Sequence, residues 1–230
     1  MNHIFTIYKI LSKEFGKQNW WPVTPDGGLK PVYRPPKRLT SSQKWEIVTG
    51  AILTQNTSWK NVEKAMINLN KRSFFQNPYK FSPSEIKKMI RPSGFYNQKS
   101  KYLNNFIRYV KINYRKNLSA LLSKNTSVLR NELLKINGIG AETADSIILY
   151  AAQKPTFVID AYTLRILNRL GVTASGDYAR VKTCMEENLP ESVKVYSEFH
   201  ALFVVLGKDF CKKKNPNCPA CPLNHMCCNR

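Results

Sequence analysis

Apolar residues recur every three or four positions along most of this chain of 230 residues. Ile4, Ile7, Leu11 and Phe15 form the first such series, and similar series run through residues 45–53 and 62–69. This spacing gathers side chains on one face of an α-helix, whereas a half-buried β-strand alternates every second residue. No stretch shows convincing alternation, so the sequence predicts an all-α fold.

Several predicted helices have recognisable ends. Asp160 and Asp177 each precede a helical stretch as N-caps, and Gly171 and Gly207 are predicted to stop two others. Residues 19–39 contain scattered prolines and glycines and are predicted to form a long irregular loop. Beyond the three series above, helices are predicted over residues 83–90, 99–112, 128–136, 141–152, 161–170, 178–189 and 193–206.

The chain carries a large excess of positive charge. It has 36 lysines and arginines against 15 acidic residues, a formal net charge of +21. Such an excess implies a polyanionic partner, although a lysine-rich composition without one is the alternative. The cations are spread along the sequence, which favours a folded basic face over a disordered tail. No apolar run reaches the roughly 18 residues of a membrane-spanning helix, and no secretory signal is visible. We therefore expect a globular cytoplasmic protein without a membrane partner.

Four cysteines close the chain in a C-x6-C-x2-C-x5-C pattern, at Cys211, Cys218, Cys221 and Cys227. Clustered cysteines in a reducing compartment more often bind metal than form disulfides. Either a tetrahedral zinc ion or an iron–sulfur cluster would suit four thiolates. Cys228 is predicted to be a spare thiol, because its neighbour fits the spacing better.

A glycine-containing turn lies between two predicted helices, over residues 134–144. Gly138 and Gly140 allow a tight hairpin, and Ile139 between them can point into the core. Backbone N–H groups at the start of the next helix would then form an anion site. An ordinary helix–helix turn is the alternative, and the two glycines alone would favour it.

Three features in order, namely this hairpin, the segment Val158-Ile159-Asp160 and the cysteine pattern, resemble the helix-hairpin-helix DNA glycosylases of the endonuclease III family. Residues 52–57 and 94–99 match further family segments, so the resemblance covers the chain from about residue 40 to its end. It implies a six-helix barrel domain over residues 41–152 and a discontinuous helical domain of residues 1–40 and 153–230. It further implies a [4Fe–4S] cluster on the four cysteines, a monomer bound to double-stranded DNA, and a nucleoid-associated protein of prokaryotic type.

Asp160 is the predicted catalytic residue. Cleavage of a glycosidic bond passes through an oxocarbenium-like state, which a nearby carboxylate can stabilise while it activates water. Helix capping alone could explain the aspartate, but in similar proteins the residue at this position is catalytic. Relatives that also nick the DNA backbone carry a lysine two residues after the second hairpin glycine, where this chain has Glu142. A carboxylate cannot form a Schiff base, so the resemblance predicts a monofunctional enzyme with weak or absent lyase activity.

The resemblance also assigns DNA contacts. Gln55 is expected to fill the space of a flipped base, and Phe95 to wedge beside it. Gly138 and Gly140 are expected to hold phosphate. The lysine run Lys212, Lys213 and Lys214 is expected to contact phosphates too, as are Lys99 and Lys101. The alternatives are a polar helix end for Gln55, an inward-packed aromatic for Phe95 and solvated charges for the lysines.

Trp20 and Trp21, followed by Pro22, resemble the branch of the family that includes bacterial 3-methyladenine DNA glycosylases. Indole faces attract cationic, alkylated purines, so this pair is predicted to line the base pocket. A hydrophobic staple over the core is the alternative. The sequence thus predicts a glycosylase that removes alkylated purines such as 3-methyladenine and leaves an abasic site. The rival functions are removal of mispaired or oxidised pyrimidines and a non-catalytic, DNA-binding iron–sulfur module.

Overall fold

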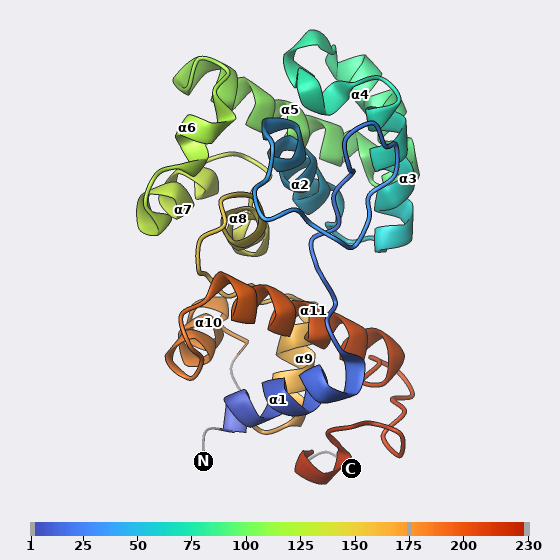
Figure 1. Cartoon of the computed structure of the whole chain (residues 1–230), viewed down its shortest axis with the longest axis vertical. Helices are drawn as coiled ribbons and strands as arrows, with labels where there is room; N and C mark the ends of the chain where they lie inside the picture. The colour runs from blue at the N-terminus through green and yellow to red at the C-terminus, as the bar shows by residue number, and fades with distance from the viewer. Residues whose placement is uncertain (1–2, 174–175, 228–230) are drawn as a thin grey trace. The chain divides into compact units, whose positions relative to one another are not determined.

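The structure is a computed structural model that describes residues 3–173 and 176–227. Within these ranges the chain is helical, and its one β-feature is an isolated antiparallel bridge between Val23 and Val32. The predicted all-α fold is therefore confirmed (Figure 1). The α-helices are α1 (His3–Phe15), α2 (Ser41–Leu53), α3 (Trp59–Asn70), α4 (Pro83–Met89), α5 (Tyr96–Asn113), α6 (Leu118–Leu122), α7 (Thr126–Leu134), α8 (Ala141–Ser146), α9 (Ala161–Arg169), α10 (Tyr178–Glu187) and α11 (Val193–Asp209).

Shorter helical turns connect these elements. The 3₁₀ turns are η1 (Phe74–Gln76), η2 (Pro78–Lys80), η3 (Arg91–Ser93) and η5 (Asn224–Met226), and a π-helical turn, η4 (Ile147–Ala151), continues α8. The predicted helix over residues 141–152 is thus an α-helical half followed by a π-helical half. None of the helices in the described ranges combines the length and apolar character needed to cross a membrane.

The chain divides into two compact units. One combines the residues up to Trp20 with those from Pro155 onward, and the other spans Trp21–Lys154. We call them the terminal unit and the central unit. The structure places residues 21–40 in the central unit, where the sequence prediction had assigned them to the discontinuous domain. Packing explains the difference, because Val23 pairs with Val32 and Thr24 bonds to the buried carboxylate of Glu46 in α2, at 2.6 and 2.9 Å.

The central unit is built around α2, which contacts α3, α5, α6 and α8 (Figure 1). Thr40 and Gln43 form a reciprocal capping box that starts this helix, and from Trp45 to Leu53 its residues are all buried. A helix that is buried on every side must be surrounded by apolar partners. Trp45 supplies one such contact, edge-on to Phe106 of α5 with 5.7 Å between ring centroids. This packing holds the C-terminal end of α2 in a defined position, and with it Gln55, which follows two residues later.

The terminal unit is built around α11, which contacts both α1 and α9 (Figure 1). Of the predicted apolar stripe of α1, Ile4, Ile7 and Leu11 are buried, and Phe15 at the end of the helix is half-buried. The predicted stop at Gly207 is wrong, because α11 continues to Asp209. Gly207 is instead a packing residue: a Cβ there would lie 2.3 Å from the ring of Tyr162 in α9. Its missing side chain lets α9 and α11 approach closely.

Candidate active site and nucleic-acid interface

Asp160 lies at the N-terminus of α9 as its N-cap, as predicted. Its Oδ1 accepts hydrogen bonds from the backbone N–H of Thr163 at 2.7 Å and from the Thr163 hydroxyl at 2.8 Å. The residue is 8% exposed, so the carboxylate has been taken almost entirely out of water. These two donors fix one oxygen and leave Oδ2 with a different neighbour.

That neighbour is His200, a buried residue of α11 whose Nε2 lies 3.6 Å from Oδ2 of Asp160. Burial by itself raises the pKa of Asp160, but interaction with His200 and the hydrogen bonds from Thr163 outweigh it and hold the pKa below its ordinary value. Asp160 is therefore ionised near neutral pH in spite of its burial. A dry carboxylate that keeps its charge is suited to stabilise a developing positive charge.

Two arginines of α9 hold the loop that carries the cysteines. Arg165 donates to the carbonyl oxygens of Cys211 and Gly207, at 2.8 and 2.9 Å. One turn later, Arg169 donates to the carbonyl oxygen of Lys212 at 2.8 Å and to the sulfur of Cys211 at 3.3 Å. Because Asp160 caps the same helix, α9 connects the candidate catalytic group to the cysteine loop.

The four predicted ligand cysteines are each half-buried. They lie close enough to influence one another, since burial and, to a smaller extent, the other three cysteines raise the pKa of the Cys221 thiol. Yet no three ligands in the described ranges converge tightly enough to hold a metal ion. By their chemistry, four thiolates suit either a tetrahedral zinc ion or a four-thiolate iron–sulfur cluster. Cys228 lies outside the described residues.

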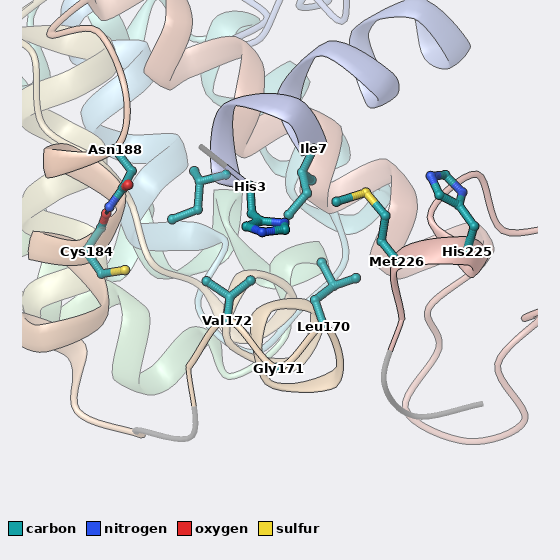
Figure 2. Close-up of a pocket in the computed structure, with 10 residues that line it drawn as sticks. His3, Ile7, Leu170, Gly171, Val172, Cys184, Asn188, His225 and Met226 are labelled. Carbon is teal, nitrogen blue, oxygen red and sulfur yellow. Dashed lines mark hydrogen bonds between the residues drawn. The ribbon is translucent and has the colours of Figure 1, made fainter. Parts of the chain in front are cut away.

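The terminal unit also contains a pocket of about 620 Å³, lined in part by His3, Ile7, Val172, Cys184 and Met226 (Figure 2). Figure 2 shows apolar side chains of α1 facing Leu170 and Val172. Asp160 is not among the residues that line it. The pocket is therefore separate from the candidate catalytic carboxylate.

In the central unit, the hairpin forms as the glycines predict. Gly138 has φ +98°, and a Cβ there would lie 2.0 Å from the ring of Tyr102, so only glycine fits. Ile139 is 4% exposed and plugs the hairpin into the core, as expected. Gly140 is the exposed N-cap of α8 and has open space around its Cα. The geometry leaves the backbone at Gly140 accessible from outside.

The helices on either side of the hairpin are tied together by an ion pair. Arg130 of α7 contacts Asp145 of α8 through two hydrogen bonds, at 2.8 and 3.2 Å. Asp145 is completely buried, and the bidentate geometry compensates for its loss of hydration. The hairpin is thus held by both a steric fit and a buried charge pair.

Gln55, the predicted plug, follows the end of α2 and donates from Nε2 to the carbonyl oxygen of Gly138 at 3.0 Å and to the Thr143 hydroxyl at 3.1 Å. The structure therefore brings Gln55 and the glycine hairpin together, although 83 residues separate them in sequence. Its predicted role in filling a vacated base site stays a prediction.

Phe95, the predicted wedge, is an exposed aromatic residue in a strained conformation. Its side chain is 69% exposed, and its backbone is left-handed with φ +45°. Both properties are unfavourable for a phenylalanine, and such outliers concentrate at functional sites. The alternative of an inward-packed aromatic is wrong for this residue. A ring that points into solvent is available to contact a partner.

Lys99 does not contact solvent, so the prediction that it binds phosphate is wrong. It is 2% exposed, and its Nζ donates to the carbonyl oxygens of Leu53 at 2.8 Å and Ser93 at 2.7 Å. Burial lowers its pKa to about 8. These two carbonyls lie two residues before Gln55 and two residues before Phe95. Lys99 therefore ties together the segments that present both predicted DNA-contacting side chains.

The other predicted phosphate contacts are accessible. Lys101, Lys212, Lys213 and Lys214 are all exposed. Glu142 in α8 is exposed as well. An exposed lysine can reach a phosphate, so these positions are compatible with the predicted contacts, which stay predictions.

The two tryptophans fall in different units. Trp21 is 4% exposed, edge-on to Trp59 at 5.6 Å and tilted against Tyr150 at 5.2 Å, and it covers Gly50, where a Cβ would approach it to 2.9 Å. This indole has little open surface, so the packing supports the alternative of a hydrophobic staple for Trp21. Trp20 is half-buried in the terminal unit.

Sequence reasoning missed His200, Arg165 and Arg169. A histidine within the apolar run around residues 199–206 was a usable signal, because such a residue needs a partner when it is buried. The two arginines stand four apart, which places them on one helix face. Nothing in the sequence shows that this face meets the backbone of the cysteine loop.

Comparison with known proteins gives a consistent result. Residues 49–191 match the model of the HhH-GPD superfamily base excision DNA repair proteins. The chain is 43% identical to a Methanocaldococcus jannaschii protein named provisionally as a DNA repair glycosylase, over 99% of this chain and 96% of that protein. It is 27% identical to endonuclease III of Thermotoga maritima, over 85% of this chain and 88% of the relative.

Among solved structures, the chain is similar to a 3-methyladenine DNA glycosylase of H. pylori bound to 1,N6-ethenoadenine. The TM-score is 0.71 and the identity 27%, over 89% of this chain and 97% of the other. The hairpin geometry and the family match agree, and the match spans more than half of the sequence. The chain belongs to the HhH-GPD superfamily of base excision DNA repair proteins and, within it, is a DNA glycosylase of the endonuclease III family.

Proposed function

We propose that this DNA glycosylase is monofunctional: it hydrolyses the N-glycosidic bond of alkylated purines such as 3-methyladenine and leaves an abasic site. The observation that carries the proposal is the combination of an ionised, buried Asp160 with a glutamate at position 142. The first supplies a catalyst for hydrolysis. The second removes the amine that a lyase would use.

Asp160 acts on the sugar in this proposal. The bond between the base nitrogen and C1′ breaks, and its electron pair leaves with the base. The carboxylate stabilises the positive charge that develops on the sugar. A water oxygen then bonds to C1′, and its proton passes to Asp160. A purine methylated at a ring nitrogen, such as 3-methyladenine, is cationic in DNA, so it becomes neutral when it leaves and needs no general acid.

No other lysine near the hairpin replaces the missing nucleophile. Lys99 is enclosed by two carbonyl groups and is 2% exposed. Lys135 stands before the hairpin, outside the helix that follows it. The proposal therefore predicts base release without a covalent enzyme–DNA intermediate.

DNA contacts are proposed for the hairpin, for Gln55 with Phe95, and for the lysine run 212–214. The bond between Gln55 and the hairpin supports this assignment, because it joins a predicted plug to a predicted phosphate site. The exposure and strain of Phe95 support its role as a wedge. Flipping a base leaves a gap that such side chains can fill.

A [4Fe–4S] cluster on Cys211, Cys218, Cys221 and Cys227 is part of the proposal. When bound, the cluster would cross-link the cysteine loop and hold its exposed lysines in place. It would take no part in base removal. Arg169, which donates to the Cys211 sulfur, would stabilise a thiolate ligand at that position.

The choice of alkylated purines is supported by the similarity to the H. pylori enzyme that was solved with 1,N6-ethenoadenine. Trp20 is the remaining candidate for stacking on the base, because Trp21 is enclosed in its own unit.

A panel of duplexes with one defined lesion each tests this proposal. Purified, cluster-loaded protein should release 3-methyladenine or 1,N6-ethenoadenine, and should act more slowly on oxidised pyrimidines and on T·G mismatches. Preference for the pyrimidine substrates would replace the alkylpurine assignment. Binding to all duplexes without release of any base would overturn the glycosylase proposal itself.

A further inference from the structure

A second pocket lies in the central unit next to the residue that follows Phe95, and three of its five lining side chains are cationic. Its volume is about 400 Å³, and its lining residues are Ser84, Lys87, Lys88, Arg91 and Tyr96. All five come from α4, η3 and the first residue of α5, a continuous stretch of chain. We call it the basic pocket. Nothing in the proposed function uses it.

The cations of the basic pocket form no ion pair within the described residues, and the one carboxylate that interacts with them is Glu85, whose pKa is lowered by its hydrogen bonds to Ser82 and, to a smaller extent, by Lys88. Lys87, Lys88 and Arg91 are all exposed. The nearest carboxylate, Glu85, is bonded to Ser82 at 2.9 Å and faces Arg72 at 3.5 Å. Like charges that converge repel one another by about 1 kcal/mol per pair at 4 Å even in water. A bound anion would relieve this repulsion.

An aromatic ring orders two of these cations. The Lys87 ammonium lies 5.9 Å and the Arg91 guanidinium 6.0 Å from the centre of the Tyr96 ring. Such cation–π contacts hold long side chains in place while leaving their N–H groups free to donate. With the Ser84 hydroxyl at the rim, the pocket offers charged and neutral donors to one phosphate-sized anion.

The position of the pocket identifies the source of that anion. Tyr96 follows directly after Phe95, the exposed and strained residue proposed to enter the duplex. A wedge inserted between bases brings the adjacent sugar–phosphate backbone close to the protein. We infer that the basic pocket binds a backbone phosphate of the DNA next to the lesion, so that Phe95 has an anchor at its side. This inference rests on the proposed role of Phe95 in DNA binding.

The test measures binding to a duplex that carries a non-hydrolysable abasic analogue, so that it is independent of base release. The pocket variant is K87Q/K88Q/R91Q. The matched control is K111Q/R115Q/K116Q, which removes the same charges, two lysines and one arginine, at the other end of α5. At a rise of 1.5 Å per residue, Lys111 lies roughly 22 Å along the helix from Tyr96, and Arg115 and Lys116 follow the end of α5. Unchanged melting temperatures establish that both variants fold.

The pocket variant should bind about tenfold more weakly at physiological salt. Its plot of log affinity against log salt concentration should also be shallower, by the equivalent of about one to two phosphate contacts at about 0.9 in slope each. The control should lose much less. Equal losses in both variants would show a general effect of net charge and would overturn the inference.

A scan with neutral methylphosphonate linkages locates the phosphate. One or two linkages flanking the abasic analogue should weaken binding by the wild type and have little effect on the pocket variant. Absence of any such position contradicts the inference. A second result would also contradict the inference: millimolar inorganic phosphate, at constant ionic strength, lowers the DNA affinity of the wild type saturably to that of the pocket variant. The pocket would then be a site for free phosphate. If base release failed while these binding results held, only the proposed activity would be lost.

Discussion

At the scale of single residues, the proposed chemistry depends on how Asp160 keeps its charge while it is buried. Thr163 binds one oxygen of the carboxylate, and His200 faces the other at 3.6 Å. Both partners counteract burial, so the pKa of Asp160 stays below its ordinary value. The proposed hydrolysis thus depends on three residues, of which Asp160 is the proposed catalyst.

Replacing His200 with glutamine should move the acid limb of the pH–rate profile to higher pH. The histidine lowers the pKa of Asp160, so its removal should raise that pKa relative to the wild type, while the hydrogen bonds from Thr163 remain. Single-turnover base release should then fall in mildly acidic buffer in H200Q while the wild type retains its rate. The exposed His3 provides a control, because H3Q should keep the wild-type profile. An identical acid limb in H200Q and wild type would contradict this role.

The pKa of Asp160 also has a consequence for stability. Its folded pKa is depressed, so Asp160 contributes stability above its unfolded pKa, and this contribution is lost as pH falls through the folded pKa. His200 supplies part of the lowering of the Asp160 pKa. The free energy of unfolding of H200Q should therefore fall less than that of the wild type when the pH is lowered.

Lys99 illustrates a lysine that holds backbone segments in place rather than binding DNA. The K99M variant leaves the carbonyl groups of Leu53 and Ser93 without their donor, which should cost about 1.5–3 kcal/mol in free energy of unfolding. K101M, two residues along the same helix and exposed, should cost far less. Urea unfolding compares the two, and equal losses would remove the assigned role.

The pH dependence of the same variant provides a second measurement. The pKa of Lys99 is about 8 in the folded protein, below the ordinary 10.5, so between these pH values the unfolded chain binds more protons. The free energy of unfolding of the wild type should therefore rise relative to that of K99M from pH 8 to pH 10. A constant difference between the two proteins across this range would contradict a depressed pKa.

At the scale of secondary-structure elements, α9 joins two functions. It begins at the residue after Asp160, and its last turn carries Arg169, which binds the backbone of the cysteine loop. Arg165 binds the same loop one turn earlier. A shift of α9 would therefore move the carboxylate and the loop together.

Removing the second of these arginines should loosen the loop. R169Q loses its hydrogen bonds to Cys211 and Lys212, so trypsin should cleave after Lys212 to Lys214 about tenfold faster than in the wild type. R108Q, at an exposed site on α5, should leave the cleavage rate unchanged. If R169Q is cleaved at the wild-type rate, the arginine does not restrain the loop.

Helices and caps were largely predictable because they depend on local sequence. The apolar stripe of α1 and the caps Asp160 and Asp177 follow from residues within one or two turns. Lys99 and Gly207 were misjudged for the opposite reason. The burial of Lys99 depends on the carbonyl of Leu53, 46 residues away, and Gly207 is required by the ring of Tyr162. The local sequence around a lysine in a basic stretch, or around a glycine near a helix end, does not indicate such distant partners.

At the scale of the whole molecule, the chain forms two units with different proposed tasks. The central unit carries the hairpin, Gln55, Phe95 and the basic pocket, whereas the terminal unit carries Asp160 and the cysteine loop. The net charge of +21 suits a protein that holds a polyanion along an extended surface. The division at Trp20 and Trp21 was not predictable, because it depends on how Trp21 packs on Tyr150 and Trp59.

The metal content of the intact protein is a prediction at this scale. Protein purified without oxygen should show the broad visible absorption of sulfur-to-iron charge transfer and contain about four iron atoms per chain. The C221S variant should lose this absorption, while C184S, outside the cysteine loop, should retain it. Colourless protein with bound zinc would contradict the proposed cluster.

The central claim is hydrolysis by Asp160 without a covalent intermediate, and single-turnover release from a duplex with one 3-methyladenine tests it most directly. Wild-type protein should release the base, leave a strand that breaks only after alkali, and give no adduct with borohydride. D160N should bind the duplex and release the base at least about 100-fold more slowly. A borohydride-trapped adduct, or a D160N variant with the wild-type rate, would contradict the account.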